Sequence, residues 1–331
     1  MLNQEYLFEY KTNIKSVLFE STDNSKVHTY AILSPLKNDE ISGALLQFEN
    51  NAVPLLSMDE DEDLRDKGPQ LIRVEPKSNM AKWLTNVHGK RWVIYIQSRL
   101  ETKELQAFLS PLCTLVHPEG EEYYFHFYDN VTLQYWLPAK EDSHLFFKGI
   151  DSIIYEGDAP WSLMRYQMNK QNEIPEESYK LLHESLDLRN KKQQFSKLTL
   201  GLIDDNPSME TMFVFTDSEF EALQKVQSHN FKLELRDALW KTHPYAQKLG
   251  IEKTQNLVFE NIDLFVSTGI KQRNLLQAVL IAIFDQPQAW DKYKSQLINR
   301  IASKQQNESQ RTQAFCKELE KLQNDLENIK V

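Results

Sequence analysis

The hydrophobic pattern of the chain changes near Gly157, and this change is the feature that most constrains the fold. Before it, short runs rich in β-branched and aromatic residues, such as 92–96, alternate with helical patterns, such as 102–109. After an irregular stretch that contains Pro160 and Pro175, apolar residues recur almost only at helical spacing. The pattern therefore predicts one lobe of strands and helices and a second lobe of helices.

The first lobe is predicted to hold a sheet. Strands are expected at 27–33, 70–74, 92–96, 113–116, 122–128 and 150–155, with a hairpin turn at 117–120. Strands that alternate with short helices, together with one hairpin, favour a mixed sheet with flanking helices. We predict an α/β lobe at 1–157, a linker at 158–177 and an all-α lobe at 178–331.

Capping residues mark several predicted helix starts. Thr216 with Glu219 three positions later forms a capping box, in which each side chain satisfies a free backbone N–H of the other residue. Ser78 and Asp129 stand directly before two further helical patterns and are expected to cap them. Later helices are expected at about 231–241, 254–266, 271–284, 287–301 and 308–329.

The last predicted helix carries apolar residues at intervals of four, three, four and three, which is a heptad seam. The seam consists of Phe315, Leu319, Leu322, Leu326 and Ile329. It either packs against the preceding helices of its own lobe or binds a helix of another protein, and both interpretations stay open. These five residues are the candidate protein-binding site.

Glycine spacing excludes two common nucleotide-binding motifs. The chain has only 9 glycines in 331 residues, and the nearest two are Gly149 and Gly157, so no G-x-G-x-x-G fingerprint is present. The Gly89-Lys90 pair is followed by Arg91 and lacks the first glycine of a phosphate loop. We predict no bound cofactor.

The sequence also lacks the patterns of a catalytic or metal centre. Its 8 histidines never come closer than His117 and His126, and Cys113 and Cys316 lie far apart, so no local metal motif or disulfide framework is present. No serine stands in a G-x-S-x-G elbow. We predict no metal site, no catalytic residues and no enzymatic activity. The excess of Asp and Glu, 48 against 38 Lys and Arg, motivates a carboxylate-based hydrolase as an alternative.

An aromatic run at 123–129 admits two interpretations. His126 and Asp129 are an acid–base pair, or the run is a core strand that ends where Asp129 caps a helix. On a strand these two side chains point to opposite faces, so they could not orient each other. The core interpretation is therefore favoured.

Charge and hydropathy limit the partners. The net charge is −10 and no cluster of Lys and Arg is present, which argues against a nucleic-acid partner. The most apolar stretch, 275–284, is about ten residues long, whereas a bilayer span needs about 20. The first residues do not show the pattern of a signal peptide. We expect no membrane insertion and a cytoplasmic location.

The order of several motifs resembles the bacterial type VI secretion effector chaperones, also called adaptors, over about 25–157. The matching motifs are Tyr30-Ala31-Ile32-Leu33, Pro54-Leu55-Leu56, Gly68-Pro69-Gln70-Leu71-Ile72, Glu119-Gly120 and Phe125-His126-Phe127-Tyr128-Asp129. The Thr216–Glu219 helix start is similar to a segment that follows this domain in many members. The chain departs from the family pattern at Ser34-Pro35, His126 and Asn130-Val131, which favours a structural role for these positions.

The resemblance implies a carrier without enzymatic activity. Such a protein binds a secreted toxic effector in the cytoplasm and helps to load it onto a VgrG-class spike protein. An immunity-type protein that masks a toxin shares the same binding physics and is the alternative, with the hydrolase as a third hypothesis.

Overall fold

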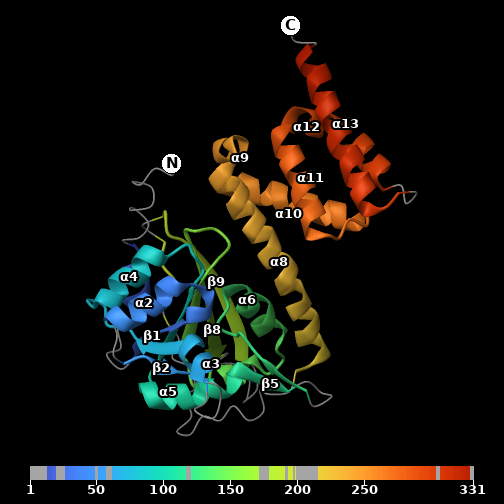
Figure 1. Cartoon of the computed structure of the whole chain (residues 1–331). Coiled ribbons are helices and arrows are strands. Elements are labelled where there is room, and N and C mark those ends of the chain that lie inside the picture. The colour runs from blue at the N-terminus through green and yellow to red at the C-terminus, as the bar shows by residue number, and fades with distance from the viewer. Residues whose placement is uncertain are drawn as a thin grey trace. The chain divides into compact units, whose positions relative to one another are not determined.

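The structure confirms a sheet-containing lobe and a helical lobe. It is a computed structural model that describes residues 13–19, 27–48, 51–56, 62–116, 121–170, 179–190, 193–196, 198, 215–302 and 306–328. The chain divides into two compact units, Met1–Val226 (unit 1) and Gln227–Val331 (unit 2). Unit 1 contains a sheet with flanking helices, and the described part of unit 2 is helical (Figure 1).

The main sheet of unit 1 has seven strands in the order β2-β3-β1-β4-β7-β8-β9. Every neighbouring pair is antiparallel, whereas the sequence predicts a mixed sheet. The helices between the strands therefore do not form the parallel crossovers that their alternation suggests. The strands are β1 (His28–Leu33), β2 (Val53–Pro54), β3 (Gln70–Arg73), β4 (Val93–Ser98), β7 (Ser152–Glu156), β8 (Ser162–Lys170) and β9 (Tyr179–Asp187).

Helices cover both faces of this sheet, which is why all six residues of β4 are buried. Ile94 and Ile96 pack into one core with α5, α6 and α7, and Val93 and Tyr95 pack into the other with α2, α4 and the helix at 13–19. The labelled helices of unit 1 are η1 (Pro35–Lys37), α2 (Asp39–Phe48), α3 (Glu62–Lys67), α4 (Asn79–Val87), α5 (Thr102–Leu109), η2 (Ser110–Cys113), α6 (Asn130–Ala139) and α7 (Ser143–Phe146).

The predicted domain boundaries need correction. Strands β8 and β9 fall where the sequence predicts a linker at 158–177 and the start of an all-α lobe at 178, and both strands extend the sheet of unit 1. Pro160 precedes β8, and Pro175 lies outside the described residues. The two units divide between Val226 and Gln227, within α8 (Asp217–Thr242).

A second, two-stranded sheet is the predicted hairpin. It consists of β5 (Thr114–Val116) and β6 (Glu122–Tyr124), and the turn at 117–120 lies outside the described residues. Beyond β6, Phe125 and Phe127 are buried in the core. Asp129 accepts hydrogen bonds from the backbone N–H groups of Val131 and Thr132 and so caps α6. Phe125, Phe127 and Asp129 thus have the predicted core and capping roles, but the expected strand at 122–128 ends at Tyr124, and Tyr123 and Tyr124 are exposed.

Unit 2 is a bundle with its own aromatic core. The ring of Phe265 lies 5.9 Å from that of Trp290 and 5.1 Å from that of Phe315, between ring centroids. Leu235 and Leu239 of α8 belong to the same core. The later helices are α9 (Pro244–Leu249), α10 (Ile251–Ser267), α11 (Arg273–Asp285), α12 (Pro287–Ile301) and α13 (Glu308–Asn328).

Candidate protein-binding site

The predicted seam lies on α13, and its residues differ in burial. Phe315 and Leu319 are 4% and 0% exposed and belong to the core of unit 2. Leu322 and Leu326 are half-buried and pack against that core. Ile329 lies outside the described residues. Among the described seam residues, only Leu322 and Leu326 pack against the core and also keep accessible surface. A binding role for the seam stays a prediction.

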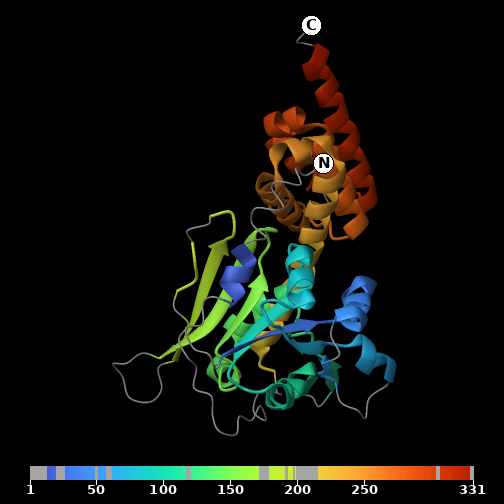
Figure 2. The ribbon, with the colours of Figure 1, turned by 90° about the vertical axis from the view of Figure 1, so that its left-hand side faces the viewer.

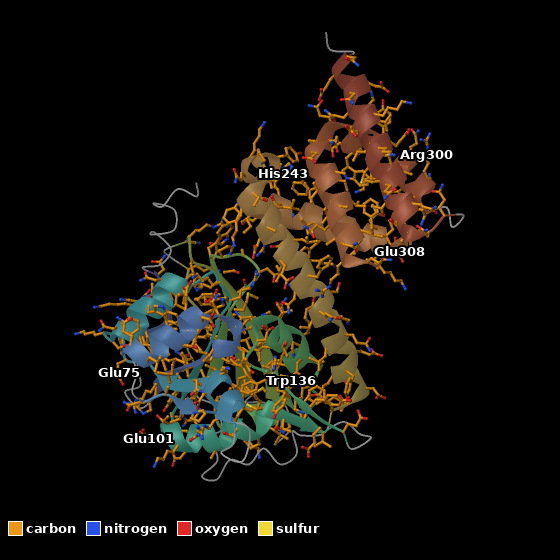
Figure 3. All side chains as sticks on the ribbon, in the orientation of Figure 1. Glu75, Glu101, Trp136, His243, Arg300 and Glu308 are labelled. Carbon is orange, nitrogen blue, oxygen red and sulfur yellow. The ribbon has the colours of Figure 1, made fainter. Side chains whose placement is uncertain are left out.

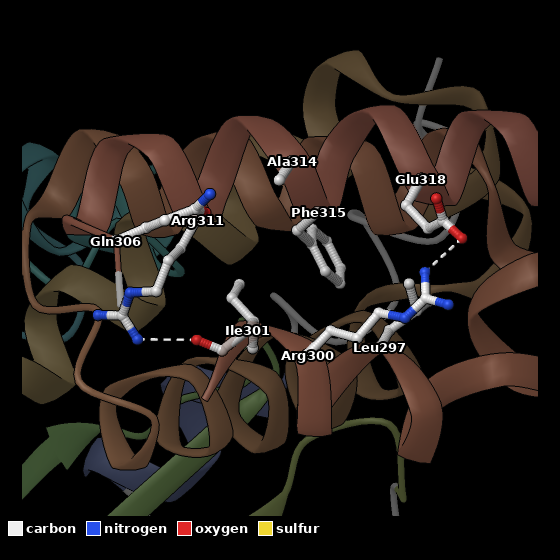
Figure 4. A pocket seen from close by; sticks show the side chains of 8 residues that line it. All are labelled: Leu297, Arg300, Ile301, Gln306, Arg311, Ala314, Phe315 and Glu318. Carbon is white, nitrogen blue, oxygen red and sulfur yellow. Dashed lines mark hydrogen bonds and ion pairs between the residues drawn. The ribbon is translucent and has the colours of Figure 1, made fainter. Parts of the chain in front are cut away.

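A pocket of about 150 Å³ lies beside the buried end of the seam, between α12 and α13 (Figure 4). Of the residues that line it, only Phe315 belongs to the predicted seam. The other α13 residues of the pocket are spaced three or four positions apart, so the sequence shows that they share one face of the helix with Phe315. The lining residues are Leu297, Arg300, Ile301, Gln306, Arg311, Ala314, Phe315 and Glu318.

The rim of the pocket carries an exposed ion pair. The Arg300 Nη1 donates to Glu318 Oε1 over 2.6 Å, and the two side chains are 59% and 30% exposed. Figure 4 shows this pair at one end of the pocket. Exposed ion pairs contribute little to stability because water screens them. Either charged group can therefore exchange its partner for a group on a bound protein at low cost.

Arg311 lines the other end of the pocket and is almost completely buried. Its Nη1 donates to the backbone oxygens of Thr268 and Ile301, both over 2.8 Å, and its Nη2 donates to that of Gly269 over 3.1 Å. Thr268 and Gly269 directly follow the last residue of α10, and Ile301 is the last residue of α12. The arginine therefore fixes one wall of the pocket by tying two helix ends to α13.

The floor between these two ends is apolar. It is formed by Leu297 and Ile301 of α12 and by Ala314 and Phe315 of α13. An apolar floor with a charged rim can bury one aliphatic or aromatic side chain of a protein partner and hydrogen-bond its polar neighbours. A cavity of this size is too small for most cofactors, which occupy pockets of roughly 300 Å³ or more.

Unit 1 contains one buried carboxylate whose pKa bears on the hydrolase hypothesis. Burial raises the pKa of Glu156 to about 7, although hydrogen bonds from the backbone N–H groups of Arg91 and Gly89 oppose the shift. These bonds measure 2.9 and 2.6 Å. Gly89 and Arg91 both have positive φ, of 91° and 57°. The carboxylate thus holds a tight turn, and its contacts support a structural role.

Among the described residues, no group of three or more His, Cys, Asp or Glu side chains is arranged to hold a metal ion. None of the described helices is both long and apolar enough to cross a membrane.

Comparison with known proteins gives one match. Residues 29–145 match the family model described as "Domain of unknown function (DUF4123)". None of the curated proteins and none of the solved structures compared with the chain matches it significantly. The matched region lies within the 25–157 that resembles the adaptors and runs from β1 into α7. Strands β7 to β9 and all of unit 2 lie beyond it.

Proposed function

We propose that this protein is a non-enzymatic cytoplasmic adaptor that binds a type VI secretion effector and helps to load it onto a VgrG-class spike protein. The match of residues 29–145 carries the proposal, because DUF4123 is known as a family of type VI effector adaptors and chaperones. The motifs of β1, β3 and the start of α6 support the same assignment.

The α12–α13 pocket supports a protein client rather than a small substrate. A carrier must hold its client and later release it, and interfaces of this kind bury a few apolar anchors inside a polar rim. The apolar floor and the Arg300–Glu318 pair have this arrangement. We assign the anchor of the client to this pocket, with Leu322 and Leu326 as the adjoining apolar surface on α13.

Co-purification tests the proposal. The full chain would be co-expressed with a type VI toxin and with a VgrG-class spike protein of the same genome, each carrying its own tag. We expect stable complexes with both proteins, detected by size-exclusion chromatography and by titration calorimetry. If neither protein binds when all three are folded, the adaptor function is wrong.

A toxicity assay separates the adaptor from an immunity protein. An adaptor leaves the toxin active in the producing cell unless a separate immunity protein is present, whereas an immunity protein abolishes toxicity by itself. Protection by this chain alone, together with no binding to the spike, would favour the immunity function. Hydrolysis of a substrate by the purified chain would favour the enzyme.

A further inference from the structure

In the described part of the chain, the main sheet has one long edge strand, β9, that is open over part of its length. β9 is nine residues long and pairs with β8 from end to end (Figure 2). The opposite edge strand, β2, has only two residues, and its Pro54 oxygen accepts a hydrogen bond from the side chain of Gln106. Open edges of long strands are sites where another strand can pair.

Hydrogen bonds at one end of β9 show which backbone groups point outward. The Asp187 N–H donates to Gln193 Oε1 over 3.1 Å, and Gln193 Nε2 donates to the Ser185 oxygen over 3.2 Å. Since backbone groups alternate in direction along a strand, those of Leu181 and His183 also point away from β8. No described residue pairs with these groups. Among the described residues, Gln193 therefore closes one end of the edge, and none of them covers 181–183.

The open stretch is complementary to itself. In antiparallel pairing about a two-fold axis at Leu182, Lys180 lies opposite Glu184 of the second copy, and Glu184 lies opposite its Lys180. Leu182 then faces Leu182, and Leu181 faces His183. An axis at Leu181 or His183 places Lys180 opposite a leucine, so the register at Leu182 is the one that pairs opposite charges.

The side chains at this edge are already positioned in the single chain. Glu184 accepts a hydrogen bond from Arg165 Nε over 2.9 Å and another from the Ser196 N–H over 2.9 Å. The ring of His183 stacks on that of Tyr166 at 4.3 Å between centroids. Lys180 is exposed and makes no ion pair within the described residues. Pairing would therefore cost little side-chain entropy apart from that of Lys180.

We propose that β9 pairs with β9 of a second copy of this chain, so that the two seven-stranded sheets become continuous. The pairing supplies four backbone hydrogen bonds from Leu181 and His183 and two Lys180–Glu184 ion pairs. A strand pair buries less surface than the roughly 1,200 Å² of a standard interface, so the dimer is expected to dissociate in the micromolar range.

Sedimentation velocity of the full chain, from about 1 to 100 µM, tests the dimer. We expect a monomer–dimer equilibrium that Lys180→Glu weakens at least tenfold, because it places like charges opposite each other. The control Lys77→Glu makes the same change at an exposed position away from β9 and should not alter the equilibrium.

A second variant tests the backbone hydrogen bonds of the proposed strand pair. Leu181→Pro removes an N–H that points away from β8 and should abolish the dimer while circular dichroism shows that the sheet is retained. A chain that is monomeric at every concentration would overturn the proposal. So would a dimer that survives both variants, or a β9 edge that pairs only with a strand of the effector or the spike. Each of these outcomes leaves the adaptor function unaffected.

Discussion

The indole nitrogen of Trp136, which is labelled in Figure 3, donates a hydrogen bond to Glu219 Oε1 over 2.9 Å, and this contact joins α6 to the first turn of α8. Lys140 Nζ lies 3.4 Å from the same oxygen, and both charged side chains are almost fully buried. The other oxygen of Glu219 accepts the backbone N–H of Thr216 over 2.9 Å and completes the predicted capping box. One buried carboxylate therefore caps α8 and fastens it to α6.

Removing this carboxylate should destabilise unit 1 strongly. Glu219→Ala leaves the indole N–H of Trp136 without an acceptor and α8 without part of its cap, whereas Lys140 keeps Asp142, 2.8 Å away, as an ion-pair partner. We expect the free energy of unfolding to fall by about 2–4 kcal/mol, as measured by chemical denaturation. Glu221→Ala, on an exposed position of the same helix, is the control and should change it by less than about 0.5 kcal/mol. Equal losses in both variants would contradict the role of Glu219.

The raised pKa of Glu156 predicts a pH dependence of stability. The folded chain holds this proton more tightly than the unfolded chain, whose glutamate has the ordinary pKa of 4.5. Each increase in pH between 4.5 and about 7 therefore favours unfolding, by a total on the order of 3 kcal/mol. Glu156→Gln does not titrate and should lose this part of the dependence. Urea denaturation of both proteins at several pH values measures the difference, and parallel curves would contradict the prediction.

Filling the pocket should block the client without unfolding the protein. Ala314 lines the pocket and is exposed, so Ala314→Trp places a large ring where the anchor of the client would lie. We expect the affinity for the effector to fall at least tenfold, while the melting temperature stays within about 2 °C. Gln313→Trp adds the same ring at the adjacent exposed position outside the pocket and is the control. Unchanged binding by Ala314→Trp would remove the pocket as the client site.

Two leucines of the seam should respond differently to the same change. Leu319→Asp buries an unpaired carboxylate in a fully enclosed position and should unfold unit 2 or make it aggregate. Leu322 is half-buried, so Leu322→Asp should retain the fold, detected by circular dichroism, and weaken effector binding. If Leu322→Asp also unfolds the unit, or binds the effector normally, the seam is core and not a binding surface.

Much of the fold could be predicted from local pattern. The expected strand at 92–96 corresponds to β4, because Val93 to Ile96 form a continuous apolar run buried on both faces. The last helix also lies where its heptad spacing places it. Capping could be predicted because it depends on residues three positions apart, as at Thr216 and Glu219.

Strand β8 is not among the strands predicted from the sequence. Its apolar Met164, Tyr166 and Met168 alternate with Arg165 and Gln167, which is a strand pattern, but the two prolines that flank it in the sequence are typical of a linker. Arg165 is fully buried all the same, because Glu184 and Ser196, which are distant in sequence, hydrogen-bond it.

The pocket could not be predicted because two helices form it. Its α12 residues Leu297, Arg300 and Ile301 meet Phe315 and Glu318 of α13 only after both helices have packed. Helical periodicity identifies a face of each helix but not which faces come together.

The contacts of Arg311 limit where the chain can be truncated. The carbonyl ends of α10 and α12 each carry the negative end of a helix dipole, and a single guanidinium from α13 neutralises both. A fragment that stops before α13 would leave these two negative ends close together and their oxygens without donors. Helices α9 to α12, which precede such a cut, would not survive as a smaller bundle, so proteolysis or truncation between α12 and α13 should unfold unit 2 as a whole.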